Sequence, residues 1–330
     1  MKKVGFFLWI MAIVMQVAIT AKAEITEAGQ LKQRMEFYER YEWLTGIPWS
    51  LIAAIDQYER NTKNFRDYCV KEDEVISICI DPKQWSGLLN PFPFDDQPHR
   101  ISLFGGIGRD GDGDGRADWH NPHDRLMTMM TGILTYGLGE EEIKQRLTDY
   151  YQTEKGVEII FTIKRLFEHF QTIDLGKRVF PIPRYYRADY TNNFGMGRSW
   201  GGRRIHEGID IFAFYGTPVL STTYGVIEIM GWNDYGGYRI GIRDMYNTYE
   251  YYAHLLGYAK GLKVGDIVEP GQIIGYVGST GYGKEGTSGK FPPHLHFGLY
   301  KFDGKREWSF NPYPYLRRWE RVKGFEKHKK

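Results

Sequence analysis

Apolar residues in the first half of the chain recur at the spacing of helix faces. Leu31, Met35, Tyr38, Tyr41 and Leu44 follow one another at steps of three and four residues, which places them on one side of a helix. The same periodicity or a helix-start signal predicts four more helices, over residues 49–58, 126–136, 140–151 and 157–170. We therefore expect the first half of the chain to be helical.

The second half has a different pattern, in which short β-rich runs alternate with glycines. Strands are predicted over residues 219–229, 238–243, 249–253, 273–277 and 294–300. Closely spaced strands bounded by turns indicate an antiparallel all-β domain. Between the halves, Gly176, Pro181 and Pro183 mark a linker over residues 176–187. The predicted fold class is a multidomain α+β protein, with a helical domain at 24–175 and a glycine-rich antiparallel β domain at 188–316.

The first 23 residues have the features of an export signal. Lys2 and Lys3 precede an uncharged run over residues 4–21, and Ala21-Lys22-Ala23 is a cleavage site of the A-x-A type. The alternative is a retained membrane anchor, since the run is about as long as the shortest spanning helices. Under either interpretation the protein is exported and works outside the cytoplasm, secreted or transiently attached to the membrane.

The charge balance predicts no nucleic-acid partner. The formal net charge is +2, and it becomes −1 when Lys2, Lys3 and Lys22 are removed with the signal. Nucleic-acid-binding domains carry a concentrated excess of Lys and Arg. The one basic segment is the tail at 317–330, which we interpret as a solvated terminus rather than a site for anionic wall polymers.

The chain has two cysteines, Cys69 and Cys79. An exported protein permits a disulfide between them, although a single pair in a chain of this length is not a disulfide scaffold. A small stapled loop and two free thiols remain equal alternatives.

Histidines and an aspartate cluster in the β domain. Gly208 disfavours a regular helix between His206 and Asp210, so their spacing of four is not that of a helix face. His294 and His296 share one face of a strand, and His254 stands at a strand end. Imidazole and carboxylate ligands suit Zn²⁺, and a catalytic zinc uses three protein ligands and one water. The residue pattern leaves open which histidines are ligands.

A long run of motifs carries a family resemblance. In order, the motifs are HEGIDI from residue 206, YGTPV from 215, YAHL from 252, VGSTG from 277 and HLHF from 294. The stretch 194–300 thereby resembles the lysostaphin-like (LytM-type) zinc metallopeptidases, which cut peptidoglycan peptides. The resemblance implies an exported peptidoglycan hydrolase with one Zn²⁺ per chain.

The same resemblance assigns roles to five residues. His206, Asp210 and His296 are implied as the zinc ligands. His254 and His294 are implied as the histidines that activate the water and stabilise the tetrahedral intermediate, in an order that the sequence leaves open. A neutral imidazole can accept the proton of the water, and a protonated one can donate to the oxyanion.

A finer resemblance concerns the bond that is cut. Phe194-Gly195 and the run RSWGGRRI over 198–205 resemble the subgroup assigned to the L-Ala–D-Glu bond in spore-forming Gram-positive bacteria. Arg203 and Arg204 could then pair with a substrate carboxylate such as that of D-Glu. This predicts a role in cell-wall or spore-cortex remodelling. The alternatives are a peptidase that cuts cross-links and a non-enzymatic wall-binding or assembly protein on the same scaffold.

Two loops rich in glycine and tyrosine are expected at the rim of the groove, over residues 235–238 and 278–283. Glycines let an extended peptide approach the backbone, and Tyr235 and Tyr238 could pack on it. The alternative, that these loops are only hairpin turns, remains open.

The helical half carries a short second resemblance. The run GIPWSLIAAI over 46–55 is similar to the opening helix of soluble lytic transglycosylases and goose-type lysozymes. Their catalytic Glu would match Glu59, but Arg60 replaces the usual Ser. A neighbouring cation favours the ionised carboxylate, which is the wrong form for a general acid. We therefore favour a binding or positioning module over a second hydrolytic site.

An acidic loop over 110–121 matches the start of an EF-hand. Asp110, Asp112, Asp114 and Asp118 occupy positions 1, 3, 5 and 9, with glycine at position 6. Position 12 is Asn121 rather than Glu, and Asp124 lies just beyond. Bound Ca²⁺ and a solvated acidic turn are equal alternatives.

Overall fold

A computed structural model describes residues 28–69, 75–200 and 202–321. The predicted export signal and most of the basic tail lie outside the described residues. Within the described ranges, no helix combines the length and apolarity needed to span a bilayer. The chain divides into two compact units, one up to Asp56 and over Tyr68–Gly139, the other over Gln57–Asp67 and from Glu140 onward.

The first unit is helical, as predicted. Residues 28–45 form a helix whose Tyr38 and Tyr41 are fully buried. Pro48 precedes the next helix, which continues into the second unit. The helices that follow residues 28–45 are α2 (Trp49–Thr62), α3 (Pro82–Ser86), α4 (Pro98–Leu103) and α5 (Pro122–Leu134). The last three begin with proline, whose missing N–H costs nothing in the first helical turn.

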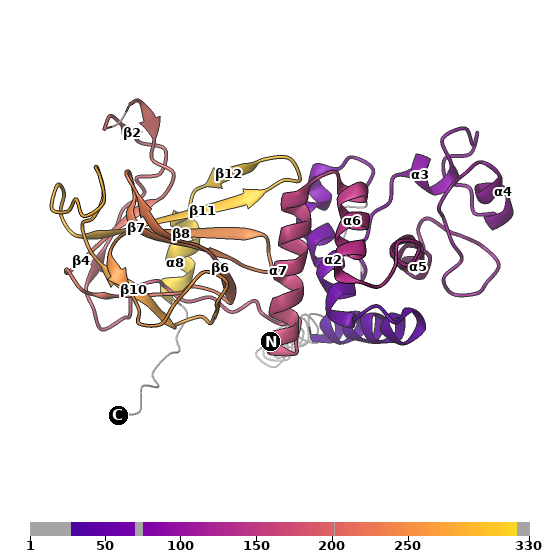
Figure 1. Ribbon diagram of the computed structural model, residues 1–330, viewed down its shortest axis with the longest axis horizontal. Coiled ribbons are helices and arrows are strands. Elements are labelled where there is room, and N and C mark those ends of the chain that lie inside the picture. Colours follow the sequence, from indigo (N-terminus) through magenta and orange to yellow (C-terminus); the bar gives the residue numbers. More distant parts are fainter. Residues whose placement is uncertain (1–27, 70–74, 201, 322–330) are drawn as a thin grey trace, which may run out of the picture. The chain divides into compact units, whose positions relative to one another are not determined.

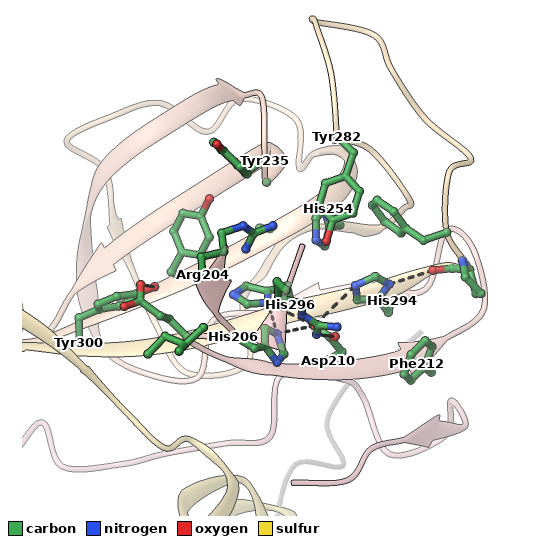
Figure 2. A pocket seen from close by; sticks show the side chains of 18 residues that line it. Arg204, His206, Asp210, Phe212, Tyr235, His254, Tyr282, His294, His296 and Tyr300 are labelled. Carbon is green, nitrogen blue, oxygen red and sulfur yellow. Dashed lines mark hydrogen bonds and ion pairs between the residues drawn. The ribbon is translucent and has the colours of Figure 1, made fainter. Parts of the chain in front are cut away.

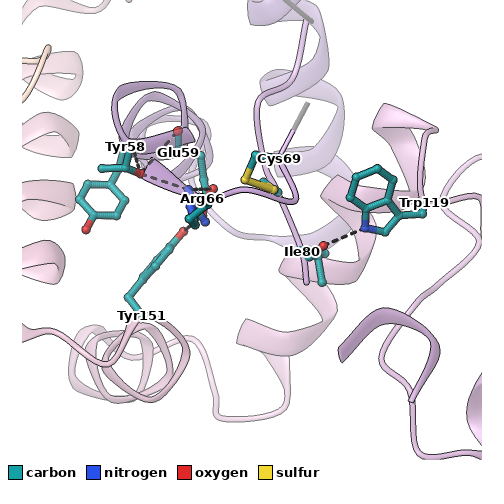
Figure 3. Close-up of a disulfide and its surroundings, with 9 residues drawn as sticks. Tyr58, Glu59, Arg66, Cys69, Ile80, Trp119 and Tyr151 are labelled. Carbon is teal, nitrogen blue, oxygen red and sulfur yellow. Dashed lines mark hydrogen bonds and ion pairs between the residues drawn. A yellow bond between two sulfur atoms is a disulfide. The ribbon is translucent and has the colours of Figure 1, made fainter. Parts of the chain in front are cut away.

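The sequence left the state of the cysteines open, and the structure joins them. Cys69 and Cys79 form a disulfide with their Cα atoms 5.6 Å apart (Figure 3). Beside it, the Trp119 indole N–H donates to the Ile80 carbonyl at 2.7 Å. The disulfide closes a loop of the chain, and such a cross-link restricts the unfolded state.

The second unit begins with η1 (Lys63–Phe65) and contains the helices α6 (Glu140–Tyr151) and α7 (Glu154–Phe170). Contacts join α7 to the sheet that follows: Lys155 lies 3.4 Å from Glu228, and Arg165 donates to the Gly265 carbonyl at 2.7 Å. These helices therefore belong to the unit of the β domain, whereas the sequence placed the boundary after residue 175. The linker at 176–187 is irregular, as expected.

The β domain is built on a ten-stranded antiparallel sheet, which confirms the predicted fold class. Its main path runs β1-β4-β11-β8-β7-β6-β9, with β5, β10 and β12 attached, and β2 and β3 pair separately (Figure 1). The strands are β1 (Ala188–Asp189), β2 (Gly197–Arg198), β3 (Arg204–Ile205), β4 (Ile209–Ala213), β5 (Pro218–Leu220), β6 (Gly225–Asn233), β7 (Gly237–Arg243), β8 (Thr248–Tyr258), β9 (Ile267–Val268), β10 (Ile273–Val277), β11 (His294–Phe302) and β12 (Glu307–Phe310). The helix α8 (Tyr313–Arg321) adds Leu316 and Trp319 to the core.

One predicted strand is divided in two. The expected strand at 219–229 is interrupted between β5 and β6, where buried Ser221, Thr222 and Thr223 turn away from the ladder. The Thr222 hydroxyl donates to the buried Glu250 carboxylate at 2.6 Å. Periodicity does not reveal such a break, because the hydroxyl partner lies 28 residues away.

Candidate metal centre

Strand register brings the three predicted ligands together. His296 on β11 lies opposite Asp210 on β4 and opposite Ala253 on β8. The Nε2 atom of His206 is 2.9 Å from Asp210 Oδ1 and 2.9 Å from His296 Nδ1, which lies 3.2 Å from the same Asp210 oxygen (Figure 2). Two imidazole nitrogens and one carboxylate oxygen therefore converge, a donor set that fits zinc.

Gly208 makes room for this convergence. A Cβ atom at Gly208 would lie 2.6 Å from His296 Cε1 and 2.7 Å from the Phe297 carbonyl oxygen. Carbon atoms do not approach so closely, and the Phe297 carbonyl belongs to the backbone of β11 and has no side-chain freedom to move. Glycine is needed here because the ligand His296 packs directly against the backbone of the neighbouring segment.

Asn193 and Arg198, to which the sequence assigned no role at the centre, hold two of the predicted ligands in place. The carbonyl of Asn193 accepts from His206 Nδ1 at 2.9 Å, which leaves the lone pair on Nε2 facing the centre. The side-chain amide of Asn193 donates to Asp210 Oδ2 at 3.2 Å, and the Arg198 guanidinium donates to the same oxygen. These contacts occupy Oδ2 and leave Oδ1 turned to the histidines. No local pattern marks Asn193, because its role depends on partners 13 and 17 residues away.

The remaining two histidines lie beside the centre with a different orientation. Both use Nδ1 to donate to a backbone carbonyl, His254 to Thr280 at 2.7 Å and His294 to Pro292 at 2.8 Å. Each therefore presents Nε2, and that of His294 is 3.6 Å from Asp210 Oδ1. The two rings are 4.8 Å apart between centroids. This pairing beside a three-ligand centre is suited to proton transfer and oxyanion binding.

The backbone of His254 is in the left-handed region, at φ 62°. Its N–H donates to the Gly236 carbonyl at 2.7 Å, which holds this conformation where the β7–β8 register shifts. A non-glycine residue at positive φ is uncommon and is kept only where its surroundings require it. The strain places the imidazole beside the centre rather than along the regular face of β8.

The electrostatic environment keeps these groups in their metal-binding or proton-accepting forms. Burial, followed by the proximity of His294 and His296, lowers the pKa of His254 well below its usual 6.5. Burial also lowers the pKa values of His294 and His296. For Asp210, burial opposes ionisation, but the adjacent side chains of His206 and His296 hold its pKa well below the usual range. The site thus combines neutral imidazoles with an ionised carboxylate.

A cavity of about 540 Å³ opens above the centre. Arg204 and Tyr235 line it, with the Arg204 guanidinium 4.9 Å from the Tyr235 ring centroid. The two other predicted substrate residues do not line it: Arg203 is exposed, and Tyr238 packs edge-on against Trp232. Adjacent arginines thus point to different surroundings, which sequence spacing did not distinguish.

Comparison with known proteins identifies the family. Residues 204–312 match the family model "Peptidase family M23". The L-Ala–D-Glu endopeptidase of Bacillus subtilis (strain 168) is 54% identical over 291 residues, which are 88% of this chain and 89% of that protein. The chain belongs to peptidase family M23. Membership confirms the predicted enzyme class, a metallopeptidase.

More distant relatives match a smaller share of the M23 chain. Lysostaphin of Staphylococcus simulans is 35% identical over 140 residues, 40% of this chain and 27% of that protein. The solved catalytic domain of lysostaphin from the same species is 36% identical over 40% of this chain and 93% of that chain, with a TM-score of 0.32.

Glu59, the candidate for a second hydrolytic site, is enclosed. Its side chain is fully buried, Tyr151 donates to Oε1 at 2.6 Å, and the Arg66 guanidinium pairs with Oε2 (Figure 3). A general acid must reach a glycan, and this carboxylate, enclosed and paired with Arg66, does not. The contacts support a positioning role, in which Glu59 joins the end of α2 to α6.

The acidic loop in the first unit converges with different members from those expected. Carboxylates of Asp110, Asp112 and Asp124 lie within reach of one ion. Those of Asp114 and Asp118 are not part of this group, and each accepts a backbone N–H two residues ahead, at 2.8 and 2.9 Å. Burial, with Asp112 and Asp110 adding to it, raises the pKa of Asp124 to about 6. The EF-hand spacing therefore predicted two of the three converging residues.

Proposed function

We propose that this M23 peptidase is a zinc endopeptidase that hydrolyses the L-Ala–D-Glu bond of peptidoglycan stem peptides. The observation that carries the proposal is the 54% identity to the Bacillus L-Ala–D-Glu endopeptidase across 89% of that protein. The site supports it, because every residue that the chemistry needs is present and oriented.

In this proposal His206, Asp210 and His296 hold one zinc ion per chain. Bound zinc supplies Lewis-acid polarisation of the scissile carbonyl and lowers the pKa of water. His254 Nε2 accepts the proton of the attacking water, since its Nδ1–H is held by the Thr280 carbonyl and the lone pair on Nε2 is therefore available. His294, whose Nδ1 is held by the Pro292 carbonyl and whose Nε2 lies 3.6 Å from Asp210 Oδ1, donates from Nε2 to the oxyanion once it has taken up a proton, which burial opposes and Asp210 favours. This assigns an order to two histidines that the sequence left interchangeable.

Arg204 supports the choice of bond. The described residues provide no carboxylate partner for its guanidinium, and its Nε is buried without a hydrogen-bond acceptor. A buried donor without a partner is costly unless a ligand completes it. D-Glu in a stem peptide keeps a free carboxylate next to the bond to L-Ala. Arg204 therefore binds this carboxylate, with Tyr235 stacked beneath the guanidinium.

The test is digestion of purified peptidoglycan with zinc-loaded protein, with and without a chelator, followed by mass spectrometry. We expect chelator-sensitive release of peptides that begin at D-Glu, leaving single L-Ala residues on the glycan. Arg204→Gln should raise KM about tenfold, whereas the adjacent Arg203→Gln should stay within twofold of wild type. Chelator-sensitive cleavage at glycine bridges or at a D-Ala bond would contradict the assignment.

We also propose that the enzyme acts outside the cytoplasm, in remodelling of the cell wall or spore cortex. The support is the export signal at 1–23, with membrane attachment through 4–21 if it is retained. N-terminal sequencing of protein recovered from the cell exterior tests this. Cleavage predicts Glu24 as the first residue, and an intact Met1 would favour the anchor.

Calcium binding in the first unit stays a prediction, now at Asp110, Asp112 and Asp124. Titration calorimetry with Ca²⁺ on wild type and Asp112→Asn tests it. Heat that is absent from the variant would support a calcium site, and no heat from wild type would leave a solvated acidic turn.

A further inference from the structure

Glu207, next to the ligand His206, is a charged residue for which the proposed reaction has no role. Its carboxylate is exposed and lines the cavity above the metal centre. Two hydroxyls hold it, Tyr300 donating to Oε2 at 3.4 Å and Ser309 donating to Oε1 at 3.3 Å. The described residues provide no cation for it, so its charge is oriented but not neutralised.

Arg204 and Tyr300, the hydroxyl partner of Glu207, lie on the same side of the centre. Figure 2 shows Arg204 and Tyr300, the partner of Glu207, on one side of His206 and His296, with His254 and His294 on the other. Tyr300 reaches the centre through Tyr251, whose ring is 6.5 Å from that of Tyr300 and 6.0 Å from His296. One arm of the cavity thus presents a guanidinium and a carboxylate, each without an ionic partner among the described residues.

A substrate that satisfies both groups carries a carboxylate and an ammonium on one side of the bond that is cut. Stem peptides meet this requirement, since D-Glu is followed by a diamino acid. We propose that Glu207 binds the free side-chain amine of this diamino acid and makes the enzyme selective for stem peptides that are not cross-linked. The inference rests on the proposed function, because it takes the D-Glu carboxylate as the partner of Arg204. Cross-linking converts the amine into a neutral amide, which removes the charge and adds bulk.

The experiment compares two peptides, L-Ala–γ-D-Glu–L-Lys with a free lysine amine and the same peptide with an acetylated amine. The zinc-loaded full-length protein is assayed as wild type, Glu207→Gln and the control Glu269→Gln, which alters an exposed carboxylate outside the cavity. Wild type and control should favour the free amine in kcat/KM by about five- to tenfold, as for a charge-assisted hydrogen bond open to solvent. In Glu207→Gln the preference should fall to within twofold, with the acetylated peptide cut as before.

The outcomes separate this inference from the function beneath it. Equal loss on both peptides in Glu207→Gln would show a structural role for the carboxylate and overturn the proposal, as would an unchanged preference. Wild type that cuts neither peptide would overturn the proposed bond. Direct titration with γ-D-Glu–L-Lys and its acetylated form then decides the role of Glu207 without turnover. Tighter binding of the free amine that is lost in Glu207→Gln supports it, and equal affinities refute it.

Discussion

Asn193 provides a sharp test of how the metal centre is organised. The variant Asn193→Ala removes the amide donor to Asp210 Oδ2 and the acceptor of the Asp210 backbone N–H, at 3.2 and 3.3 Å. It keeps the backbone carbonyl that accepts from His206 Nδ1. The three ligands remain, but the carboxylate loses one of the two side chains that hold its outer oxygen.

The expected loss of zinc affinity is about tenfold, or about 1.4 kcal/mol. Loss of a partner that orients a ligand typically costs 10- to 100-fold in metal affinity. The lower end applies because Arg198 still donates to Asp210 Oδ2 and the His206 contact is unchanged. At saturating zinc, turnover should return to within a few-fold of wild type.

Competition with a chromophoric chelator measures the zinc affinity of wild type, Asn193→Ala and the matched control Asn192→Ala. Asn192 is exposed and its side chain contacts Asn311 rather than a ligand. The control should bind zinc as wild type does. Unchanged affinity in Asn193→Ala would refute the reasoning, as would an activity loss that saturating zinc does not restore.

Three further predictions follow from single contacts. Gly208→Ala should abolish stable zinc binding and lower the free energy of unfolding by about 1–3 kcal/mol, because the new methyl group overlaps His296. Metal analysis measures the first effect and urea unfolding the second. A variant that still holds a full complement of zinc would contradict the clash. His254→Ala should retain zinc while kcat falls at least about 100-fold, and loss of metal would instead identify His254 as a ligand. Burial raises the pKa of Glu250 from 4.5 to about 7, so the native state binds its proton more tightly than the unfolded state. The stabilising contribution of this group is therefore fully present below pH 4.5 and is lost as the pH rises to about 7. Over this range the free energy of unfolding of wild type should fall by about 3 kcal/mol relative to that of Glu250→Gln. The same pH dependence of the unfolding free energy in the two proteins would refute the prediction.

Local pattern was a good guide wherever the cause of structure is itself local. Helix α6 was predicted over its full length. Helix α7 begins at Glu154, three residues before the predicted start, because the Thr153 side chain caps it by accepting a hydrogen bond from the Gly156 N–H. The grouping of α6 and α7 with the β domain depends instead on contacts that are not local. Contacts such as Lys155 with Glu228 cross 73 residues, and no periodicity reports them.

The sequence alone pointed to the residues that we expect to supply the chemistry. Alternation along a strand placed His294 and His296 on one face, and the motifs pointed to His206 and Asp210 as their companions. The class of enzyme was predicted through the resemblance of these motifs to the lysostaphin-like zinc metallopeptidases, and family membership confirms it.

Only the tertiary structure decided what each group can do. The free nitrogen of His206 follows from the Asn193 carbonyl and that of His254 from the Thr280 carbonyl, 13 and 26 residues away. The β2–β3 pairing directs Arg204 but not Arg203 into the cavity. Residue identity and periodicity are properties of neighbouring positions. Orientation, protonation and access depend on hydrogen bonds and burial between distant segments, which exist only once the chain has folded.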